Sequence, residues 1–211
     1  MTATLTVVNH PLVSHKISTL RDIKTEPEQF RRTCAEITLL TAYEGLRDLA
    51  TTETQVQTPV APAATRVLTT PAPAVIGILR AGLVMVEAIL TLLPHARVGH
   101  LGMQRNEATH EPDWYYDKLP NRLAEREVIV VDPMLATGGS ASAALSHLKD
   151  VGATRLRLLC IIGCPEGVKT VHSAHADVPI TLAAYDPGLT PNAYITPGLG
   201  DAGDRIYGTD K

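Results

Sequence analysis

Short uninterrupted runs of apolar residues alternate with segments of helical hydrophobic spacing along the chain after residue 74. The apolar runs predict buried strands at 75–79, 97–103, 128–131, 156–162 and 180–184. The segments between them predict helices at 83–93, 141–149 and 166–175. This alternation indicates an α/β fold, in which a parallel sheet is flanked by helices on both faces. Ligands of such sheets bind beyond the carboxyl ends of the strands, so the loops there are where we expect chemistry.

The first third of the chain has a different pattern. Apolar residues at helical spacing predict a long helix from about Pro27 to Leu49. Thr25 and Glu28 have the spacing of a capping box, with Thr25 as the N-cap. Residues 51–74 are dominated by Thr, Pro and Ala, and this composition predicts a linker or an irregular excursion.

Composition indicates one globular domain over residues 1–211, with 45% hydrophobic and 19% charged residues. The net charge of −3 argues against a broad nucleic-acid-binding surface, which needs a clustered basic face. No apolar run approaches the roughly 18 residues of a membrane helix. No basic segment precedes an apolar stretch near Met1, so we expect no secretory signal. These features together favour a cytoplasmic protein that binds neither nucleic acid nor membrane.

Cysteines and histidines do not form a recognisable metal-binding pattern. The cysteines are Cys34, Cys160 and Cys164, an odd number without a CxxC pair, so we expect reduced thiols. His172 and His175 are three residues apart, but no further Cys or His completes a zinc spacing. We therefore expect helix-face or surface histidines and no metal site built from protein side chains.

The strongest chemical signal follows the strand at 128–131. Asp132 ends the strand, a loop with Gly138 and Gly139 follows, and a helix begins there. Loop amides and a helix N-terminus form a cradle for anions, and glycine allows a phosphate to approach closely. The segment lacks the Lys-Ser/Thr of a nucleoside-triphosphate loop and the GxGxxG of a dinucleotide site. It therefore favours a phosphorylated sugar, although an ordinary strand-to-helix turn would also contain a glycine pair.

Two arginines stand at the ends of other predicted strands. Arg80 follows the strand at 75–79, and Arg105 follows the strand at 97–103. A guanidinium at a strand's carboxyl end can hold phosphate oxygens in a bidentate manner. Residues 106–120 after Arg105 are polar and contain three neighbouring aromatic residues. This stretch is typical of a mobile lid or an interface arm, and the sequence does not decide between them.

Glycines also dominate the end of the chain, at positions 198, 200, 203 and 208. Tyr194 and Ile195 precede them, which argues against a solvated tail. A tight glycine loop exposes backbone N–H and C=O groups in a fixed order. That order can complement a small planar ring that carries a donor between two acceptors.

Taken together, these segments resemble the uracil phosphoribosyltransferase family. The resemblance extends over residues 9–208 and is most specific in two blocks. The matching residues are His10-Pro11-Leu12-Val13, Ile78-Leu79-Arg80-Ala81-Gly82-Leu83, Arg105-Asn106-Glu107, Val131-Asp132-Pro133-Met134-Leu135-Ala136-Thr137-Gly138-Gly139-Ser140, Pro165-Glu166-Gly167, Tyr194-Ile195 and Pro197-Gly198-Leu199-Gly200-Asp201-Ala202-Gly203-Asp204.

The resemblance implies a type I phosphoribosyltransferase fold with a C-terminal base-binding hood. It implies that uracil and 5-phospho-α-D-ribose 1-diphosphate (PRPP) give UMP and diphosphate, in pyrimidine salvage. It assigns PRPP to Arg80, Arg105, Asp132, Pro133, Met134, Leu135, Ala136, Thr137, Gly138, Gly139, Ser140 and Asp201, and uracil to Ile195, Gly200, Asp201 and Ala202. Among these, Arg80, Arg105, Asp132 and Asp201 are the candidate catalytic residues.

The family also implies a magnesium ion, a homodimer or higher homo-oligomer and, in some members, a GTP effector. Only one acid, Asp132, stands at the mouth of the main loop, where related enzymes have two. We therefore expect Mg²⁺ to arrive bound to the diphosphate substrate. The chain departs from the family pattern at Val84, Gln104 and Thr196.

Two alternatives remain, a regulator from another functional class and an enzyme with a different base. A regulator with the same fold could sense nucleotides or bind RNA, but the chain has no block of five or more like charges. An enzyme for another pyrimidine or a purine would also fit the fold. The short glycine loop beside Ile195 favours a small ring over a purine.

Overall fold

The computed structural model describes residues 4–105 and 112–209, and all of their side chains except those of residues 104, 105 and 112. Its central sheet has the order β1–β10–β9–β7–β4–β5–β6, and the short β8 pairs beside β9. The strands are β1 (Leu5–Val7), β4 (Ala74–Leu79), β5 (Arg97–Arg105), β6 (Pro112–Lys118), β7 (Glu127–Val131), β8 (Met134–Leu135), β9 (Arg155–Gly163) and β10 (Ile180–Tyr185). Only β6 runs antiparallel to its neighbour among the strands described in this sheet.

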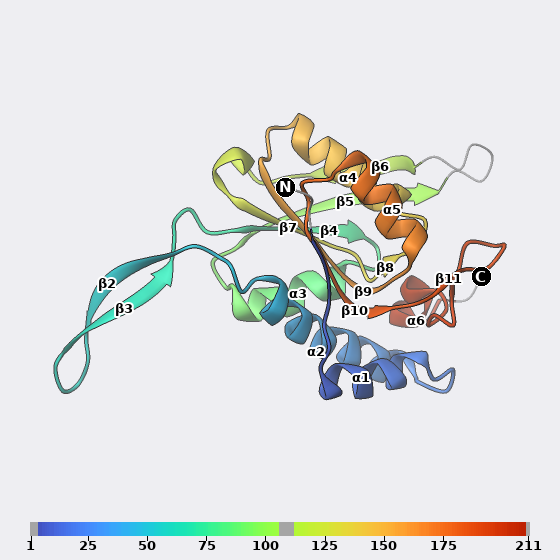
Figure 1. The fold of residues 1–211 in the computed structure, drawn as a ribbon, viewed down its shortest axis with the longest axis horizontal. Helices are drawn as coiled ribbons and strands as arrows, with labels where there is room; N and C mark the ends of the chain where they lie inside the picture. Colours follow the sequence, from blue (N-terminus) through green and yellow to red (C-terminus); the bar gives the residue numbers. More distant parts are fainter. Residues whose placement is uncertain (1–3, 106–111, 210–211) are drawn as a thin grey trace.

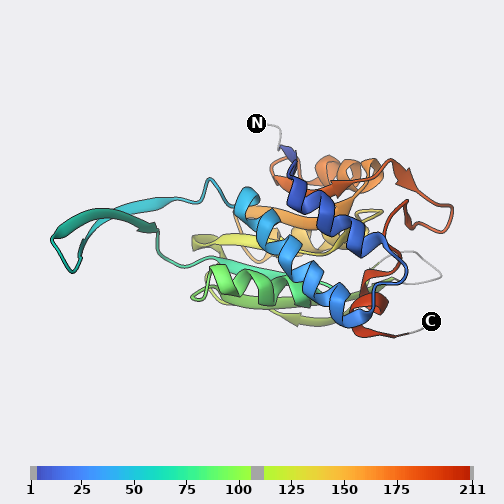
Figure 2. The same ribbon diagram turned by 90° about the horizontal axis from the view of Figure 1, so that it is seen from below.

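Helices cover both faces of the sheet (Figures 1 and 2). They are α1 (Pro11–Arg21), α2 (Pro27–Gly45), α3 (Leu83–Leu92), α4 (Gly139–Asp150), α5 (Pro165–Ala174) and α6 (Ala202–Tyr207), with a 3₁₀ turn at Leu123–Glu125. Alternate residues of each strand serve two cores, so Val75 packs with α1, α2 and α3, and Ile76 packs with α4 and α5. This arrangement confirms the predicted α/β fold with a mainly parallel sheet.

Residues 51–74 are not an irregular linker, and that prediction is wrong. They contain an antiparallel hairpin of β2 (Thr51–Gln57) and β3 (Pro62–Leu68), paired from Thr51–Leu68 to Gln57–Pro62. The Thr and Val residues of both strands are β-branched and favour extended backbone. The hairpin projects away from the rest of the molecule, at the end opposite α6 (Figures 1 and 2).

The start of α2 also differs from the predicted capping box. The N-cap is Glu26, which makes no side-chain capping bond, and Pro27 occupies the first turn. Thr25 Oγ1 instead donates a hydrogen bond to Thr19 O at 2.6 Å, which fastens the turn between α1 and α2. The helix ends at Gly45, four residues before the predicted end at Leu49.

All three cysteines are buried and free. Burial raises the pKa of Cys34 to about 12, so this thiol stays protonated and unreactive.

His175 is also buried rather than on the surface, and its Nε2 lies 3.0 Å from Ser142 O and 3.2 Å from Ser146 Oγ. Within the described part of the chain, no three Cys, His, Asp or Glu side chains gather as metal ligands. None of the helices described there is both long and apolar enough to cross a bilayer.

Candidate functional site

A cleft of about 600 Å³ lies beyond the carboxyl ends of the central strands. Residues of three separated segments line it, together with Met103 of β5. They are 78–81 at the end of β4, Asp132, Met134, Ala136 and Ser140 between β7 and α4, and 192–195 with 200–203 near the C-terminus. The fold therefore brings three of the four predicted segments into one site. The side chain of Arg105, in the fourth segment, lies outside the described part.

The segment between β7 and α4 has the backbone of an anion cradle. Gly138 is the N-cap of α4 and has a φ of +82°, a conformation that favours glycine. A Cβ on Gly138 would also lie only 2.7 Å from Gly167 O of α5. The first turn of the 12-residue α4 is the positive end of the helix dipole. It contains Ser140 and N–H groups that have no partner within the helix. This is a suitable position for a phosphate.

Two predicted PRPP residues contact the protein interior instead of the cleft. Leu135 is 1% exposed in the core, and its carbonyl accepts a hydrogen bond from Cys164 N. Pro133 O accepts hydrogen bonds from Ile161 N at 3.1 Å and Ile162 N at 3.0 Å. Neither residue lines the cleft, and Thr137, Gly138 and Gly139 lie between the lining residues Ala136 and Ser140.

Asp132 stands where the buried β7 opens into the cleft. It is half-buried, and loss of solvent raises the pKa of its carboxyl to about 7, despite a weak hydrogen bond from Met134 N at 3.5 Å. Near neutral pH the group can therefore exist as an acid or as a carboxylate. A bound cation or a ribose hydroxyl would favour the carboxylate.

Arg80 leaves β4 through a turn that requires glycine. A Cβ at Gly82 would lie 2.6 Å from Ile78 O and 2.7 Å from Val131 O, so no side chain fits there. The Arg80 guanidinium is about half exposed and its Nη2 lies 3.2 Å from Asp204 Oδ1. Arg80 O accepts a hydrogen bond from the Tyr207 hydroxyl at 3.0 Å. Helix α6 therefore holds the backbone of Arg80 and aligns its side chain at the edge of the cleft.

The C-terminal hood, residues 188–207, consists of β11 (Gly188–Leu189), β12 (Ile195–Thr196) and α6. Ile195 is 4% exposed and contributes an apolar wall to the cleft. Gly200 has a φ of +81°, and Asp201 caps α6 by accepting a hydrogen bond from Asp204 N at 3.0 Å. Gly200, Asp201 and Ala202, to which the resemblance assigns uracil, all line the cleft.

Sequence reasoning missed several residues of this site. It did not anticipate Met103, Asn192 and Ala193, or the role of Asp204 as the partner of Arg80. Asp201 followed three residues later by Asp204 was the available signal for the start of α6, because Asp is a good N-cap.

Two of the three departures from the family pattern, Val84 and Thr196, lie away from the lining of the cleft. Val84, in the first turn of α3, packs against the core, and Thr196 is exposed where β12 pairs with Gly188. The side chain of Gln104 lies outside the described part.

Residues 112–118, within the predicted lid or arm, form strand β6, whose pairing with β5 shifts register between Gly102 and Met103. Trp114, Tyr115 and Tyr116 are 42–52% exposed along it. His147 Nε2 lies 2.9 Å from Asp117 Oδ2 and the His147 ring packs 5.1 Å from Trp114, so β6 is fastened to α4. Residues 106–111 are outside the described part, and the lid prediction for them stays a prediction.

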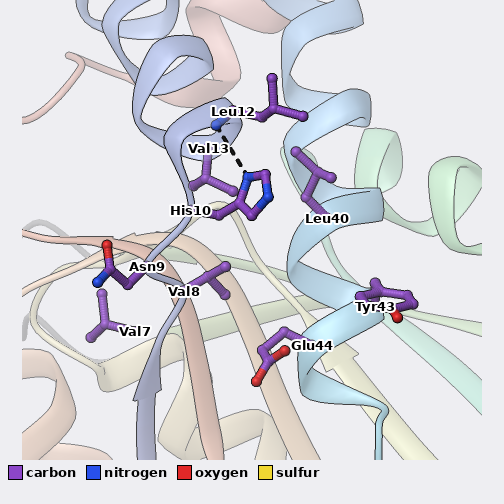
Figure 3. Close-up of a pocket in the computed structure, with 9 residues that line it drawn as sticks. All are labelled: Val7, Val8, Asn9, His10, Leu12, Val13, Leu40, Tyr43 and Glu44. Carbon is purple, nitrogen blue, oxygen red and sulfur yellow. Dashed lines mark hydrogen bonds between the residues drawn. The ribbon is translucent and has the colours of Figure 1, made fainter.

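A second hollow, of about 510 Å³, lies between β1, α1 and α2 (Figure 3). Its lining includes apolar Val7, Leu12 and Leu40 beside the exposed ring of Tyr43. His10 Nδ1 accepts a hydrogen bond from Leu12 N at 3.1 Å and so caps α1. The His-Pro-Leu-Val motif is thus explained by helix capping, and the hollow contains none of the predicted site residues.

The chain is similar to known proteins over nearly its whole length. A family model described as "Uracil phosphoribosyltransferase" matches residues 7–209. A protein of that name from Thermus thermophilus is 54% identical over 205 residues, which are 97% of this chain and 99% of the relative. Another, from Caldanaerobacter subterraneus, is 53% identical over 203 residues, covering 96% and 97% of the two chains.

Solved structures are also similar to this chain in fold. The AQ2163 protein from Aquifex aeolicus has a TM-score of 0.93 at 36% identity, over 98% of this chain and 99% of that one. A hypoxanthine-guanine phosphoribosyltransferase from Bacillus anthracis has a TM-score of 0.52 at 15% identity, over 76% and 80% of the chains, and shares the fold alone. The sequence match over nearly the whole chain is decisive, and the chain belongs to the uracil phosphoribosyltransferase family.

Proposed function

We propose that this chain is one catalytic domain that transfers the phosphoribosyl group of PRPP to N1 of uracil, giving UMP and diphosphate. The observation that carries the proposal is the convergence of Arg80, the 132–140 segment and the hood on one cleft. Residues of an anion cradle and an apolar wall both line that cleft. Membership of the uracil phosphoribosyltransferase family agrees with this reaction.

The anion cradle is suited to the phosphorylated sugar. The backbone of 136–140 and the Ser140 hydroxyl would bind the 5-phosphate at the start of α4. Asp132 at the cleft would accept hydrogen bonds from ribose hydroxyls. Arg80 is placed to bind the diphosphate, and Arg105 is proposed for the same task from its position at the end of β5.

The hood is suited to uracil. Backbone groups of 200–202 can pair with the donor and acceptors of a pyrimidine edge, while Ile195 contacts the ring. Asp201 faces the cleft from the same loop and would orient the base or the sugar diphosphate. The short glycine loop beside Ile195 favours a small ring over a purine.

Magnesium fits the site only as part of the substrate. Asp132 is the acid at the mouth of the main loop, and the described residues contain no cluster of three ligands. The ion prefers phosphate oxygens and water, so it would arrive with PRPP and neutralise the leaving diphosphate.

Catalysis by these residues would depend mainly on positioning and charge. Breaking the bond between C1 and the diphosphate leaves a cation-like sugar and a leaving group with growing negative charge. Arginine side chains aimed at that leaving group stabilise the transition state. Holding the 5-phosphate at α4 and uracil in the hood brings N1 to C1 without a strong general base.

The direct test is UMP formation from uracil, PRPP and Mg²⁺, with and without GTP. Magnesium-dependent product supports the proposal, and the comparison with GTP tests the proposed effector. Cytosine and hypoxanthine serve as competing bases, and equal turnover of all three would contradict the assignment of uracil. A folded protein that forms no product under either condition would favour a regulator with this fold.

Homo-oligomerisation and a cytoplasmic location also belong to the proposal. The β2–β3 hairpin supports the first, because Val60 at its tip is 93% exposed and Val67 is 49% exposed. Apolar side chains on a projecting arm are typical of a surface that meets another copy.

A further inference from the structure

A part-buried ion pair lies behind the hood, outside the lining of the cleft. Arg21, the last residue of α1, donates from Nη1 to Asp186 Oδ2 at 2.8 Å and from Nη2 to Asp186 Oδ1 at 2.6 Å. Asp186 directly follows β10 and is 4% exposed. Neither side chain takes part in the chemistry assigned to the cleft.

Both members of this pair also bind the backbone of Gly198. Arg21 Nη1 donates to Gly198 O at 2.8 Å, and Gly198 N donates to Asp186 Oδ2 at 2.8 Å. Gly198 has a φ of +60°, and a Cβ there would lie 2.0 Å from Ile195 O. The turn is therefore specific to glycine, and the ion pair satisfies both polar groups of that residue.

A second arginine holds the next residue of the same loop. Arg205 of α6 donates from Nη1 to Leu199 O at 2.8 Å and from Nη2 to Asp22 O at 2.6 Å, and its guanidinium packs 4.4 Å from the Phe30 ring. The carbonyls of residues 198 and 199 are thus held by two guanidinium groups. The loop that presents 200–202 to the cleft is anchored from behind, on the α1 side.

The electrostatics keep Asp186 charged near neutral pH. Burial raises the pKa of Asp186, but the hydrogen bonds from Arg21 and from Gly198 N outweigh it and hold the pKa below its ordinary value. Asp186 is therefore a carboxylate, and Arg21 is its cation. The other charged groups of α1 near this end are Lys16, which pairs with Glu36, and Asp22, which follows the helix.

We propose that Arg21 and Asp186 are positioning residues for the base: by fixing Gly198 they set the loop that binds uracil, without touching either substrate. The inference rests on the proposed function, because it assigns uracil to residues 195–202. It places the determinant of base affinity about twenty residues from the start of the chain, on a helix that lines no part of the cleft.

The test compares Arg21→Met with Lys16→Met. The first variant removes the guanidinium group and keeps an apolar side chain. The second breaks the ion pair between Lys16 and Glu36, which joins α1 only to α2. We expect Arg21→Met to raise the KM for uracil by about tenfold or more, with the KM for PRPP changed less than about twofold. Lys16→Met should leave both constants unchanged. Arg21→Lys should restore part of the uracil affinity, since it keeps the charge and loses the bidentate contact.

Amide hydrogen exchange provides a readout that does not depend on turnover. Loss of the anchor should speed exchange in 197–202 at least about tenfold in Arg21→Met, while exchange in 132–140 stays as in the wild type. Asp186→Asn gives a second variant if Arg21→Met does not fold, because it keeps one oxygen for Gly198 N.

The outcomes separate the two proposals. Wild-type protein that forms no UMP contradicts the proposed function. Active wild type combined with an unchanged uracil KM and unchanged exchange in folded Arg21→Met or Asp186→Asn overturns the positioning role. An equal rise of both KM values would also overturn it, since that marks a general structural effect.

Discussion

Arg80 is half exposed at the cleft, while its backbone is fixed by Tyr207 and by the turn at Gly82. Its side chain can therefore be changed with little effect on folding. Arg80→Gln should lower kcat about 100-fold through loss of a charge that stabilises the leaving diphosphate. The melting temperature should change by less than about 2 °C, since the lost contact to Asp204 is a partly exposed ion pair. Steady-state kinetics and a thermal melt check both parts, and unchanged turnover would remove Arg80 from the diphosphate site.

Asp201 has two roles that one pair of variants separates. It caps α6 through Asp204 N, and its carboxylate faces the cleft. Asn caps helices as well as Asp does, whereas Ala does not. Asp201→Asn should therefore lose most activity at nearly unchanged stability, and Asp201→Ala should also lose about 1 kcal/mol of unfolding free energy. Equal loss of stability in both variants would show that the charge, rather than the cap, stabilises the fold.

Asp132 should make the stability of the free protein depend on pH. Its folded-state pKa of about 7 lies above the ordinary value, so the folded protein binds this proton more tightly than the unfolded chain. The group therefore favours folding at low pH, and this contribution decreases as the pH rises from about 4 to about 7. Asp132→Asn removes the unfavourable charge. We expect it to raise the melting temperature at pH 8, to change it little at pH 5, and to lower activity at both values.

At the scale of elements, Gly138 and Gly167 allow α5 to pack closely against the phosphate segment. A Cβ at Gly167 would lie 2.5 Å from Leu135 O and 2.6 Å from Ala136 O, both backbone atoms. Gly167→Ala should therefore displace the 135–140 segment, destabilise the protein by about 1–3 kcal/mol and raise the KM for PRPP. Gly139→Ala is the control for stability, since its Cβ would approach only Thr137 Oγ1 at 3.7 Å. Chemical denaturation of both variants, with PRPP titrations, provides the measurement.

The elements of the sheet were predictable because their signal is local. Uninterrupted apolar runs indicated β4, β7 and β9 and the helices between them, and the burial of these strands confirms that interpretation. The hairpin was missed because Pro and Ala obscured the β-branched alternation of its strands. The three-residue β1 depends on pairing with β10, and tertiary pairing of this kind leaves little trace in a short segment.

The site was partly predictable for the same reason. Arg80 and Asp132 stand directly after strands, so the topology alone places them at the ligand edge. Pro133 and Leu135 could not be distinguished from lining residues, because burial on one side of a loop is a tertiary property. The anchor formed by Arg21, Asp186 and Gly198 joins three distant segments, and no spacing in the sequence indicates it.

At the scale of the whole molecule, the projecting hairpin predicts self-association. Val60→Asp should shift the proposed oligomer toward monomer, because a charge at the apolar tip must lose its water when another copy covers it. Ile23→Asp is the matched control, since Ile23 is 91% exposed at the turn between α1 and α2. Light scattering at several concentrations measures the effect. Equal association of both variants would show that the hairpin tip is not the contact.

The pairing of β1 with β10 has a consequence for how the protein folds. Leu5 lies beside Ile180, so this contact closes a loop of about 175 of the 211 residues. Loops of such length form late, because their closure costs conformational entropy before the contacts that stabilise them have formed. Arg21 lies on the helix that follows β1, and its partner Asp186 follows β10. We therefore expect refolding to order the central strands and the phosphate segment first. Competence to bind PRPP should then appear before competence to bind uracil.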